Sequence, residues 1–443
     1  MKIQLSDHFT YGRLLRFTLP SIVMMIFTSI YGVVDGIFVS NYTGKTAFAA
    51  LNLIMPYLMV FGTLGFMIGT GGTALVSMTL GMGDRKRANE IFSMLVYVSI
   101  LGGIVLTFLS VCFLRPAARA LGATGQMLED CVSYGSIVLL ALTGYILQYA
   151  FQSFCVTAEK PNLSLGMTVA AGVSNMVLDA LLVAVFRWGL AGAAVATAIS
   201  QLLGGVIPIV YFARPNGSLL RLGKCRFDGT ALLRTCTNGS SELMSSLSMS
   251  VVSMLYNYQL IKYAGEDGIA AYGVIMYVNF IFAAIFIGFS VGSAPITGYH
   301  YGAGNYGELR GLLRRSLCIL AGFSAVITLA AALLASPLAK IFVGYDRVLL
   351  QMTVRAFRIY ALSFLVCGFN IFGSSFFTAL NNGLISAVIS FLRTLVCQIA
   401  AVMLLPLVLG LDGIWWSVVA AELAALILTG FFLIKYRGRY HYA

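Results

Sequence analysis

The sequence predicts an all-α, polytopic membrane protein with twelve transmembrane helices in two six-helix lobes. Apolar stretches of roughly 20 residues or more recur along the whole chain, and each is long enough to cross ~30 Å of hydrocarbon. Only 10% of the 443 residues are charged, whereas a soluble domain carries about 25%. In addition, motifs of the first half return in the second half at a constant spacing.

The twelve spans follow from the apolar runs that lie between polar segments. The opening segment is not expected to be a cleaved signal peptide, because the apolar run after it is too long and lacks a small-residue cleavage site. We therefore expect a retained first span. The spans are expected at residues 13–41, 48–78, 88–114, 129–155, 162–186, 189–213, 232–262, 269–297, 311–338, 353–378, 384–409 and 413–435.

The net charge of +12 is explained by how the positive residues are distributed between the two sides. If the N-terminus is cytoplasmic, the inner segments hold 18 Lys and Arg residues and the outer segments hold 7. The positive-inside rule then predicts a multi-pass protein of the inner (cytoplasmic) cell membrane with both termini in the cytoplasm. Because topology accounts for the charge, we expect contacts with membrane lipids and no nucleic-acid partner.

The cysteines and histidines do not form a reactive or metal-binding pattern. The eight cysteines show no CxxC spacing, and the three histidines lie at span ends or in tails. This pattern argues against a Cys/His metal site and against a nucleophilic enzyme. We expect no cofactor and no enzymatic activity.

The halves of the chain are related by an internal duplication. GFMIGTGGTALVSMTLGMGD (65–84) resembles GFSVGSAPITGYHYGAGN (288–305), and an offset of 221 relates Gly81 to Gly302 and Gly189 to Gly410. A constant offset over separated motifs indicates a repeat. The break falls in RPNGSLLRLGKCRFDG (214–229), so we expect an N-lobe of residues 1–218 and a C-lobe of residues 219–443.

Six spans per copy fix how the two lobes are related. Because each copy has an even number of spans, both copies insert into the membrane in the same orientation. The pseudo-two-fold axis that relates them therefore runs along the membrane normal. The interface between them then lies near the bilayer midplane, where secondary transporters bind their substrates. No strand precedes the GxG turns and no GKS/T follows them, so a nucleotide site is not expected.

Polar residues gather at one depth of the first half. Asp35 lies in the first span, Asn175 and Asp179 lie one helical turn apart in the fifth, and Thr197 lies in the sixth. At 1.5 Å per residue, all fall roughly 9–12 Å below the outer surface. Tyr31 lies one turn from Asp35.

The second half lacks this cluster. At the same offset, Asn175, Asp179 and Thr197 correspond to Val396, Ala400 and Val418. The six-helix unit is therefore built without these polar groups, which favours a functional role for the cluster over a structural one.

The cluster predicts a cation-coupling site. A charged Asp inside the membrane costs about 2.5–3.5 kcal/mol, and two carboxylates that share a poorly solvated site favour uptake of a cation. We expect H⁺ or Na⁺ to bind there, with Na⁺ held by Asp35, Asn175, Asp179 and Thr197. Because 100 mV moves ~2.3 kcal/mol per charge, such a cation could drive the export of another solute.

Other polar residues inside the spans have separate expectations. Arg393 and Glu422 are expected to form a structural ion pair. Pro20 lies fifteen residues before Asp35 in the first span, where it permits a kink and is a candidate hinge. The candidates for a substrate cavity are Glu242, Asn257, Asn279 and Asn370, although the asparagines also suit hydrogen bonds between helices.

Four segments of the chain match a known family: LPSIVMMIFTSIYGVVDGIFV, GTGGTALVSMTLGMGDRKRAN, NMVLDALLVAVFRWGLAGAAVATAIS and GSAPITGYHYGAGN. Through them the chain resembles the MATE (multidrug and toxic compound extrusion) transporters over nearly its full length. The segment SSELMSSLSMSVVSMLYN, which contains Glu242, is most similar to the MepA-like branch.

This resemblance implies a V-shaped pair of lobes that exports small hydrophobic or cationic compounds against H⁺ or Na⁺ by alternating access. It matches the family's coupling cluster to Tyr31, Asp35, Asn175, Asp179 and Thr197, and its kinking proline to Pro20. Residues 353–378 contain no acid, unlike the sodium-coupled branch with an aspartate in span ten, so no cation site is expected in the C-lobe. We expect a monomer, and the alternative function is a flippase for a lipid-linked saccharide or another amphiphile.

Overall fold

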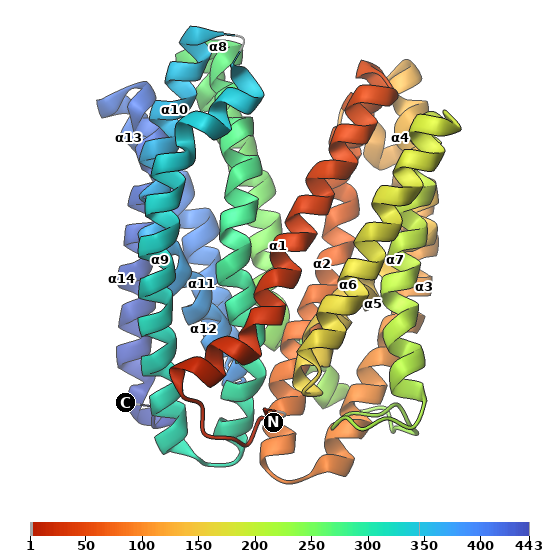
Figure 1. The fold of residues 1–443 in the computed structure, drawn as a ribbon, viewed down its shortest axis with the longest axis vertical. Helices are drawn as coiled ribbons and strands as arrows, with labels where there is room; N and C mark the ends of the chain where they lie inside the picture. The colour runs from red at the N-terminus through yellow and green to blue at the C-terminus, as the bar shows by residue number, and fades with distance from the viewer. Residues whose placement is uncertain (1–2, 345, 443) are drawn as a thin grey trace.

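All regular elements of the described residues, 3–344 and 346–442, are helices in this computed structural model. The side chains at positions 37, 40, 41, 45 and 48 lie outside the description. Figure 1 shows two groups of long helices that stand side by side, with both chain ends near the same end of the molecule. We call this the termini end and the opposite one the far end.

The first lobe contains α1 to α7. Its helices are α1 (Tyr11–Tyr42), α2 (Lys45–Gly81), α3 (Arg85–Ala120), α4 (Gly125–Leu140), α5 (Leu142–Thr157), α6 (Pro161–Asp179) with the π-helix η1 (Ala180–Val185), and α7 (Gly189–Ala213).

The second lobe contains α8 to α14. Its helices are α8 (Gly229–Gly302), α9 (Tyr306–Val343), α10 (Arg347–Ala361), α11 (Phe364–Ala379), α12 (Gly383–Phe391) with the π-helix η2 (Leu392–Cys397), α13 (Gln398–Leu409) and α14 (Leu411–Tyr440).

These helices give the twelve spans that the sequence predicts. Nine stretches of the described chain are long and apolar enough to cross a membrane, and the bent pairs α4–α5 (56°) and α10–α11 (48°) add one span each. The long α8 is a hairpin, because Gly265 leaves the helical conformation at φ 62° and ψ −148°. Tyr256 and Tyr272 stack across this bend with ring centroids 5.1 Å apart. Counted separately, the arms 229–264 and 266–302 bring the total to twelve.

The duplication is visible in the positions of the breaks. α4 ends at Leu140 and α10 ends at Ala361, which is the offset of 221 found in the sequence. The sequence did not predict that spans four and ten are bent, or that spans five and eleven contain π-helical turns. No proline lies at either bend, and the apolar run continues through it. Neither feature of the sequence therefore marks where these spans bend.

The lobes meet on their two-fold axis through a reciprocal glycine contact. A methyl group on Gly81 would lie 2.0 Å from the carbonyl oxygen of Tyr299, and one on Gly302 would lie 2.0 Å from that of Met78. Met78 and Tyr299 are themselves related by 221 residues. Such a contact, in which each copy touches the other in the same way, requires a residue without a side chain on both sides.

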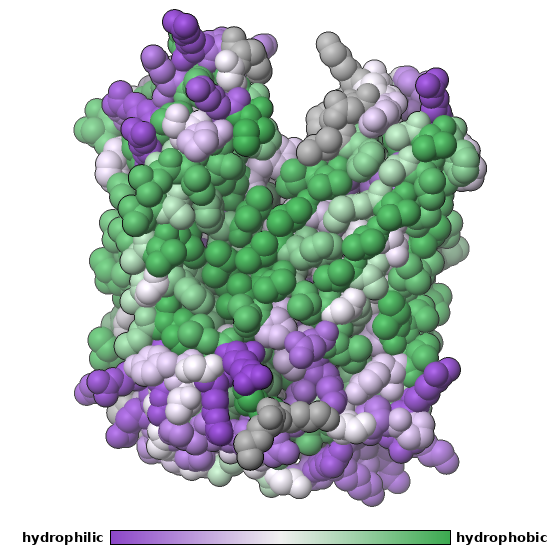
Figure 2. All heavy atoms as spheres, viewed as in Figure 1, coloured by the Kyte–Doolittle hydropathy of each residue, from purple (hydrophilic) through white to green (hydrophobic). Residues whose placement is uncertain are grey.

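Close contacts between the lobes are concentrated toward the termini end. Gly239 packs on Met67, and Gly292 packs on Thr18. Figure 2 shows an apolar band between two hydrophilic ends, and a notch between the lobes at the far end. The molecule is therefore a multi-pass membrane protein whose cleft opens at the far end.

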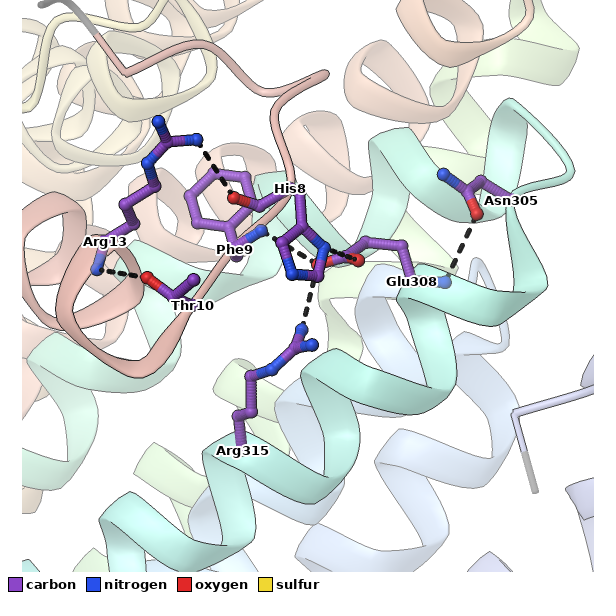
Figure 3. Close-up of polar contacts among 7 residues, drawn as sticks. All are labelled: His8, Phe9, Thr10, Arg13, Asn305, Glu308 and Arg315. Carbon is purple, nitrogen blue, oxygen red and sulfur yellow. Dashed lines mark hydrogen bonds and ion pairs between the residues drawn. The ribbon is translucent and has the colours of Figure 1, made fainter.

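The chain before α1 crosses the termini end and joins both lobes. The backbone N–H of Leu5 donates to Glu159 of the first lobe at 2.7 Å, and that of Phe9 donates to Glu308 of the second at 2.9 Å. Figure 3 shows Glu308 between His8 and Arg315, which lie 2.6 and 3.0 Å from its oxygens. Leu5 and Phe9 are fully buried, so this segment is packed in place.

The connection between the lobes is docked on α3. Arg85 donates to the carbonyl oxygen of Ser218 at 2.9 Å, and Asn89 accepts from the N–H of Arg221 at 2.6 Å. Farther along, Ser93 accepts from the N–H of Gly223 at 3.0 Å. The segment that the sequence identifies as polar is thus held against the first lobe.

Candidate functional site

Two carboxyl groups face each other inside the first lobe. Asp35 lies on α1 and is 9% exposed, and Asp179 ends α6 and is fully buried. Each carboxyl group lies in the immediate electrostatic surroundings of the other. Asp35 Oδ1 and both oxygens of Asp179 have no hydrogen-bond partner among the described residues.

Asn175 and Thr197 add two more oxygen atoms. Asn175 lies one turn before Asp179 on the buried face of α6, and Thr197 lies on the neighbouring α7. Asn175 Oδ1 and Thr197 Oγ1 are buried and also lack partners within the described chain. All four residues that the sequence suggests for a cation site are therefore in the interior of one lobe.

Tyr134 belongs to this site, although the sequence analysis missed it. It lies on α4, is 1% exposed, and has Asp35, Asp179 and Thr197 in its immediate surroundings. Its position, nine residues after the start of α4 at Gly125, gives a depth of about 13 Å. The sequence offers no signal that separates Tyr134 from the other tyrosines of the apolar spans, because only the packing of α4 brings it to the carboxylates.

On the side toward the termini end, the site is bounded by Tyr31 and Gln148. Tyr31 lies one turn before Asp35, and Gln148 of α5 lies within reach of its hydroxyl. On α6, Gly172 faces this tyrosine, because a methyl group there would lie 3.0 Å from the Tyr31 ring and 2.5 Å from that of Phe27. The glycine lets α1 and α6 approach closely enough for Asp35 and Asp179 to meet.

A π-helical segment begins directly after Asp179. The six residues of η1, Ala180–Val185, interrupt the regular spacing of span five. Such segments are frequent at functional sites, because the widened turn changes the direction of the side chains next to it. Here it places the carboxyl group of Asp179 at the junction of two helical geometries.

The chemistry of the site follows from five oxygen atoms that have no hydrogen-bond partner among the residues the structure describes. A buried polar group without a partner costs about 1–3 kcal/mol, and two nearby negative charges repel each other. A proton on a carboxylate removes one charge, while oxygen atoms are the ligands that hard cations prefer. The donor set therefore fits either H⁺ or Na⁺.

The second lobe has a closed ion pair instead. The guanidinium Nε of Arg393 lies 3.0 Å from both carboxylate oxygens of Glu422, and its terminal nitrogen lies 2.9 Å from Oε1. Asn370 donates to Glu422 Oε2 at 2.7 Å and is fully buried. The predicted Arg393–Glu422 pair is confirmed, and Asn370 lies in the lobe interior.

The other cavity candidates lie on α8. Glu242 is half-buried between Gly239, which packs on Met67 of α2, and Ser246, which lies 3.0 Å from Thr63 of α2. Residues at this spacing share one helix face, so Glu242 faces the boundary between the lobes. Asn257 and Asn279 are half-buried on the two arms of α8.

The hinge candidate Pro20 lies inside the continuous α1 and lines a cavity of about 320 Å³ at the termini end.

Comparison with known families decides the class of protein. The MatE family matches the chain twice, at residues 20–181 and 243–404, once in each lobe. The chain belongs to the MATE family. MATE proteins are membrane transporters and not enzymes, and the double match corresponds to the duplication seen in the sequence and in the fold.

Relatives of this MATE chain match it along almost its whole length. "Multidrug export protein MepA" of Staphylococcus haemolyticus is 24% identical over 97% of this chain and 94% of its own. The protein of that name from Staphylococcus aureus (strain MRSA252) is 23% identical, covering 95% and 93%. A structure described as "Outward-facing conformation of a multidrug resistance MATE family transporter of the MOP superfamily" has a TM-score of 0.94 at 20% identity, covering 100% and 99%. At that identity, the structural match shows the fold alone.

Proposed function

We propose that this MATE chain is a cation-coupled antiporter that exports hydrophobic or cationic compounds by alternating access. The observation that carries the proposal is the cluster of buried oxygens around Asp35 and Asp179 that have no hydrogen-bond partner among the described residues. A site used for coupling must bind and release its ion, so it cannot be closed by a permanent partner. The second lobe has such a partner in Arg393.

The coupling follows from the electrostatics of the pair. With the cleft open at the far end, H⁺ or Na⁺ enters the N-lobe and neutralises charge between Asp35 and Asp179. Neutralisation removes the repulsion that favours separation of α1 and α6. Pro20 then acts as a hinge, since it has no N–H to donate within α1. Bending of α1 at this hinge transmits the effect of ion binding to the cleft.

The orientation and the substrate class complete the proposal. With both termini in the cytoplasm of a bacterial cell, the cleft faces outward, and the lobes of residues 1–218 and 219–443 rock against each other as a monomer. Glu242 offers a carboxylate at the lobe boundary, which suits a cationic compound. The names of the MepA relatives support drugs as the exported class.

Efflux from proteoliposomes tests this function. A cationic dye is loaded, and H⁺ and Na⁺ gradients are imposed separately. We expect one gradient to drive dye movement in the native protein, and Asp35→Asn to abolish it while thermal unfolding stays cooperative. Native efflux that neither gradient accelerates, or gradient-driven efflux that persists in Asp35→Asn, would contradict antiport through this site. Movement of a lipid-linked saccharide analogue without dye transport would favour the flippase.

A further inference from the structure

We propose that a hydrated polar track leads from the Asp35–Asp179 site toward the termini end, inside the first lobe, and that the coupling cation leaves through it. This proposal rests on the antiport function above. It assigns a role to buried side chains of α5 and α6 that belong neither to the cation site nor to the cleft.

The first observation is a polar stripe along one face of α6. Its buried face carries Ser164, Thr168, Asn175 and Asp179 at spacings of four, seven and four residues, which lie on one side of a helix. At 1.5 Å per residue, the stripe extends about 22 Å from Asp179 toward the termini end. In Figure 1, α6 runs beside α1 over this length.

Direct contacts show which residues of α1 and α5 face the stripe. Ser164 Oγ lies 3.0 Å from Met24 Sδ of α1 and donates to the carbonyl oxygen of Gln152 of α5 at 2.9 Å. Higher up, Gly172 faces Tyr31, and Asp179 faces Asp35. The three helices therefore enclose the stripe from the cation site down to Ser164. The rings of Phe27 and Tyr31 cover it at Gly172, so a cation passes this point only when these rings move.

The second observation is that polar atoms around this stripe are unpartnered. Thr168 Oγ1 and both polar atoms of the Gln152 side chain are buried and have no hydrogen-bond partner in the described parts of the chain. Gln152 and Thr168 are at most 1% exposed. Buried amides and hydroxyls are rarely left unsatisfied, and water is their usual partner where protein groups are missing.

The lower end of the track approaches a cavity. Pro20 of α1 lines the cavity of about 320 Å³ at the termini end. Leu163, which precedes Ser164, lines the same cavity. The helices that enclose the track thus end at a space near the proposed cytoplasmic side.

The second lobe provides an internal control. When α6 and α12 are aligned at their first residues, which are 222 apart and not 221, Ser386 and Ser390 take the places of Ser164 and Thr168. These serines are closed by protein partners, because Ser374 lies 2.9 Å from the hydroxyls of both Ser386 and Ser390, and Thr378 lies 2.7 Å from Ser386. The lobe without the cation site has its polar stripe sealed, and the lobe with the site does not.

The track is built for a cation carried by water. Hydroxyl and amide groups can hydrogen-bond a chain of water molecules, and their oxygens can also hold a partly hydrated Na⁺. Between Asn175 and Ser164, the stripe carries no charged side chain, so the cation does not meet a second tight site on its way. The cation would then be released at the termini end through the first lobe, without passing through the cleft between the lobes.

The test replaces the track by apolar side chains of similar shape. The double variant Thr168→Val with Gln152→Met is compared with Ser386→Ala with Ser390→Ala, in proteoliposomes driven by H⁺ or by Na⁺. We expect the track variant to slow gradient-driven dye efflux at least tenfold and the control to stay within twofold. Drug–drug exchange at equal ion concentrations requires no net ion release, so we expect it to stay native in both.

The outcomes separate the two proposals. Equal slowing of gradient-driven efflux and of drug–drug exchange in the track variant would overturn the track, because it indicates a general defect in the conformational cycle. Native gradient-driven efflux in the track variant, with loss in Asp35→Asn, would overturn the track and leave the antiport function intact. Gradient-driven efflux that persists in Asp35→Asn would overturn the antiport function itself. Thermal unfolding of each variant checks that it is folded.

Discussion

The imidazole Nδ1 of His8 lies 2.6 Å from Oε2 of Glu308, across 300 residues of sequence. The same carboxylate accepts from the N–H of Phe9 and lies 3.0 Å from Arg315. Since the neighbouring Leu5 is bonded to Glu159 of the other lobe, movement that opens the termini end must disturb this segment. Glu308 thus ties the start of the chain to the closed end of the molecule.

Glu308→Gln is expected to loosen this closure. The amide retains one acceptor but loses the charge that His8 and Arg315 face, which costs about 1–3 kcal/mol. Hydrogen–deuterium exchange of residues 3–10 should accelerate about tenfold or more, since a factor of ten corresponds to about 1.4 kcal/mol. Glu90→Gln, in a pair with Arg87 within one helix, serves as the control. Unchanged exchange in Glu308→Gln would show that the carboxylate does not hold the segment.

Gly302→Ala is expected to force the lobes apart at their two-fold axis. The added methyl would lie 2.0 Å from the carbonyl oxygen of Met78, so backbone must move, at a cost of about 1–3 kcal/mol for overpacking. We expect a lower melting temperature in detergent. Gly102→Ala, where no atom lies within 4 Å of the new methyl, should melt like the native protein. Equal melting of both variants would contradict the reciprocal contact.

Glu422→Gln should destabilise the protein more than removal of the whole pair. Glu422 is buried against Arg393, and breaking a buried pair from one side costs about 3–5 kcal/mol because a charge is left alone. The double variant Arg393→Met with Glu422→Leu should recover most of the loss. Thermal unfolding checks this order, and a double variant that is less stable than Glu422→Gln would contradict it.

Asp228 predicts a pH dependence outside the membrane. Its carboxylate accepts from the N–H of Ala231 and pairs with Arg87, and these contacts hold the pKa of Asp228 below its usual value. A lowered folded pKa means that the stabilisation is complete above the unfolded value of about 3.9 and is lost as the pH falls through the folded value. We expect the native protein to melt above Asp228→Asn at pH 6 and to approach it as the pH falls below about 4. A difference that does not change with pH would exclude ionisation of Asp228 as the cause.

The number of spans and the pairing of charges could be predicted from the sequence because both follow from local or pairwise rules. Apolar length fixes a span, and Arg393 needs an acid such as Glu422 when both are buried. Because helices rise by a constant distance per residue, the sequence positions alone predicted a similar depth for Asp35, Asn175, Asp179 and Thr197.

Other features depend on how the helices pack together, which could not be predicted from this one sequence. Tyr134 is one of many tyrosines in apolar spans, and only the packing of α4 against α1 and α6 places it at the carboxylates. The bend at Ala141 has no proline to mark it. The unpartnered state of Thr168, against the bonded state of Ser390, is likewise a property of the neighbouring helices rather than of either residue.

The docking of residues 218–223 on α3 has a mechanical consequence. Arg85 donates a hydrogen bond to this segment, and Asn89 and Ser93 accept hydrogen bonds from it, so the covalent link between the halves is held against α3. Asp228, at the start of α8, also pairs with Arg87 of α3. We therefore expect the second lobe to move relative to the first mainly by rotation near Asp228, over a range set by the short peptide between Gly223 and Asp228.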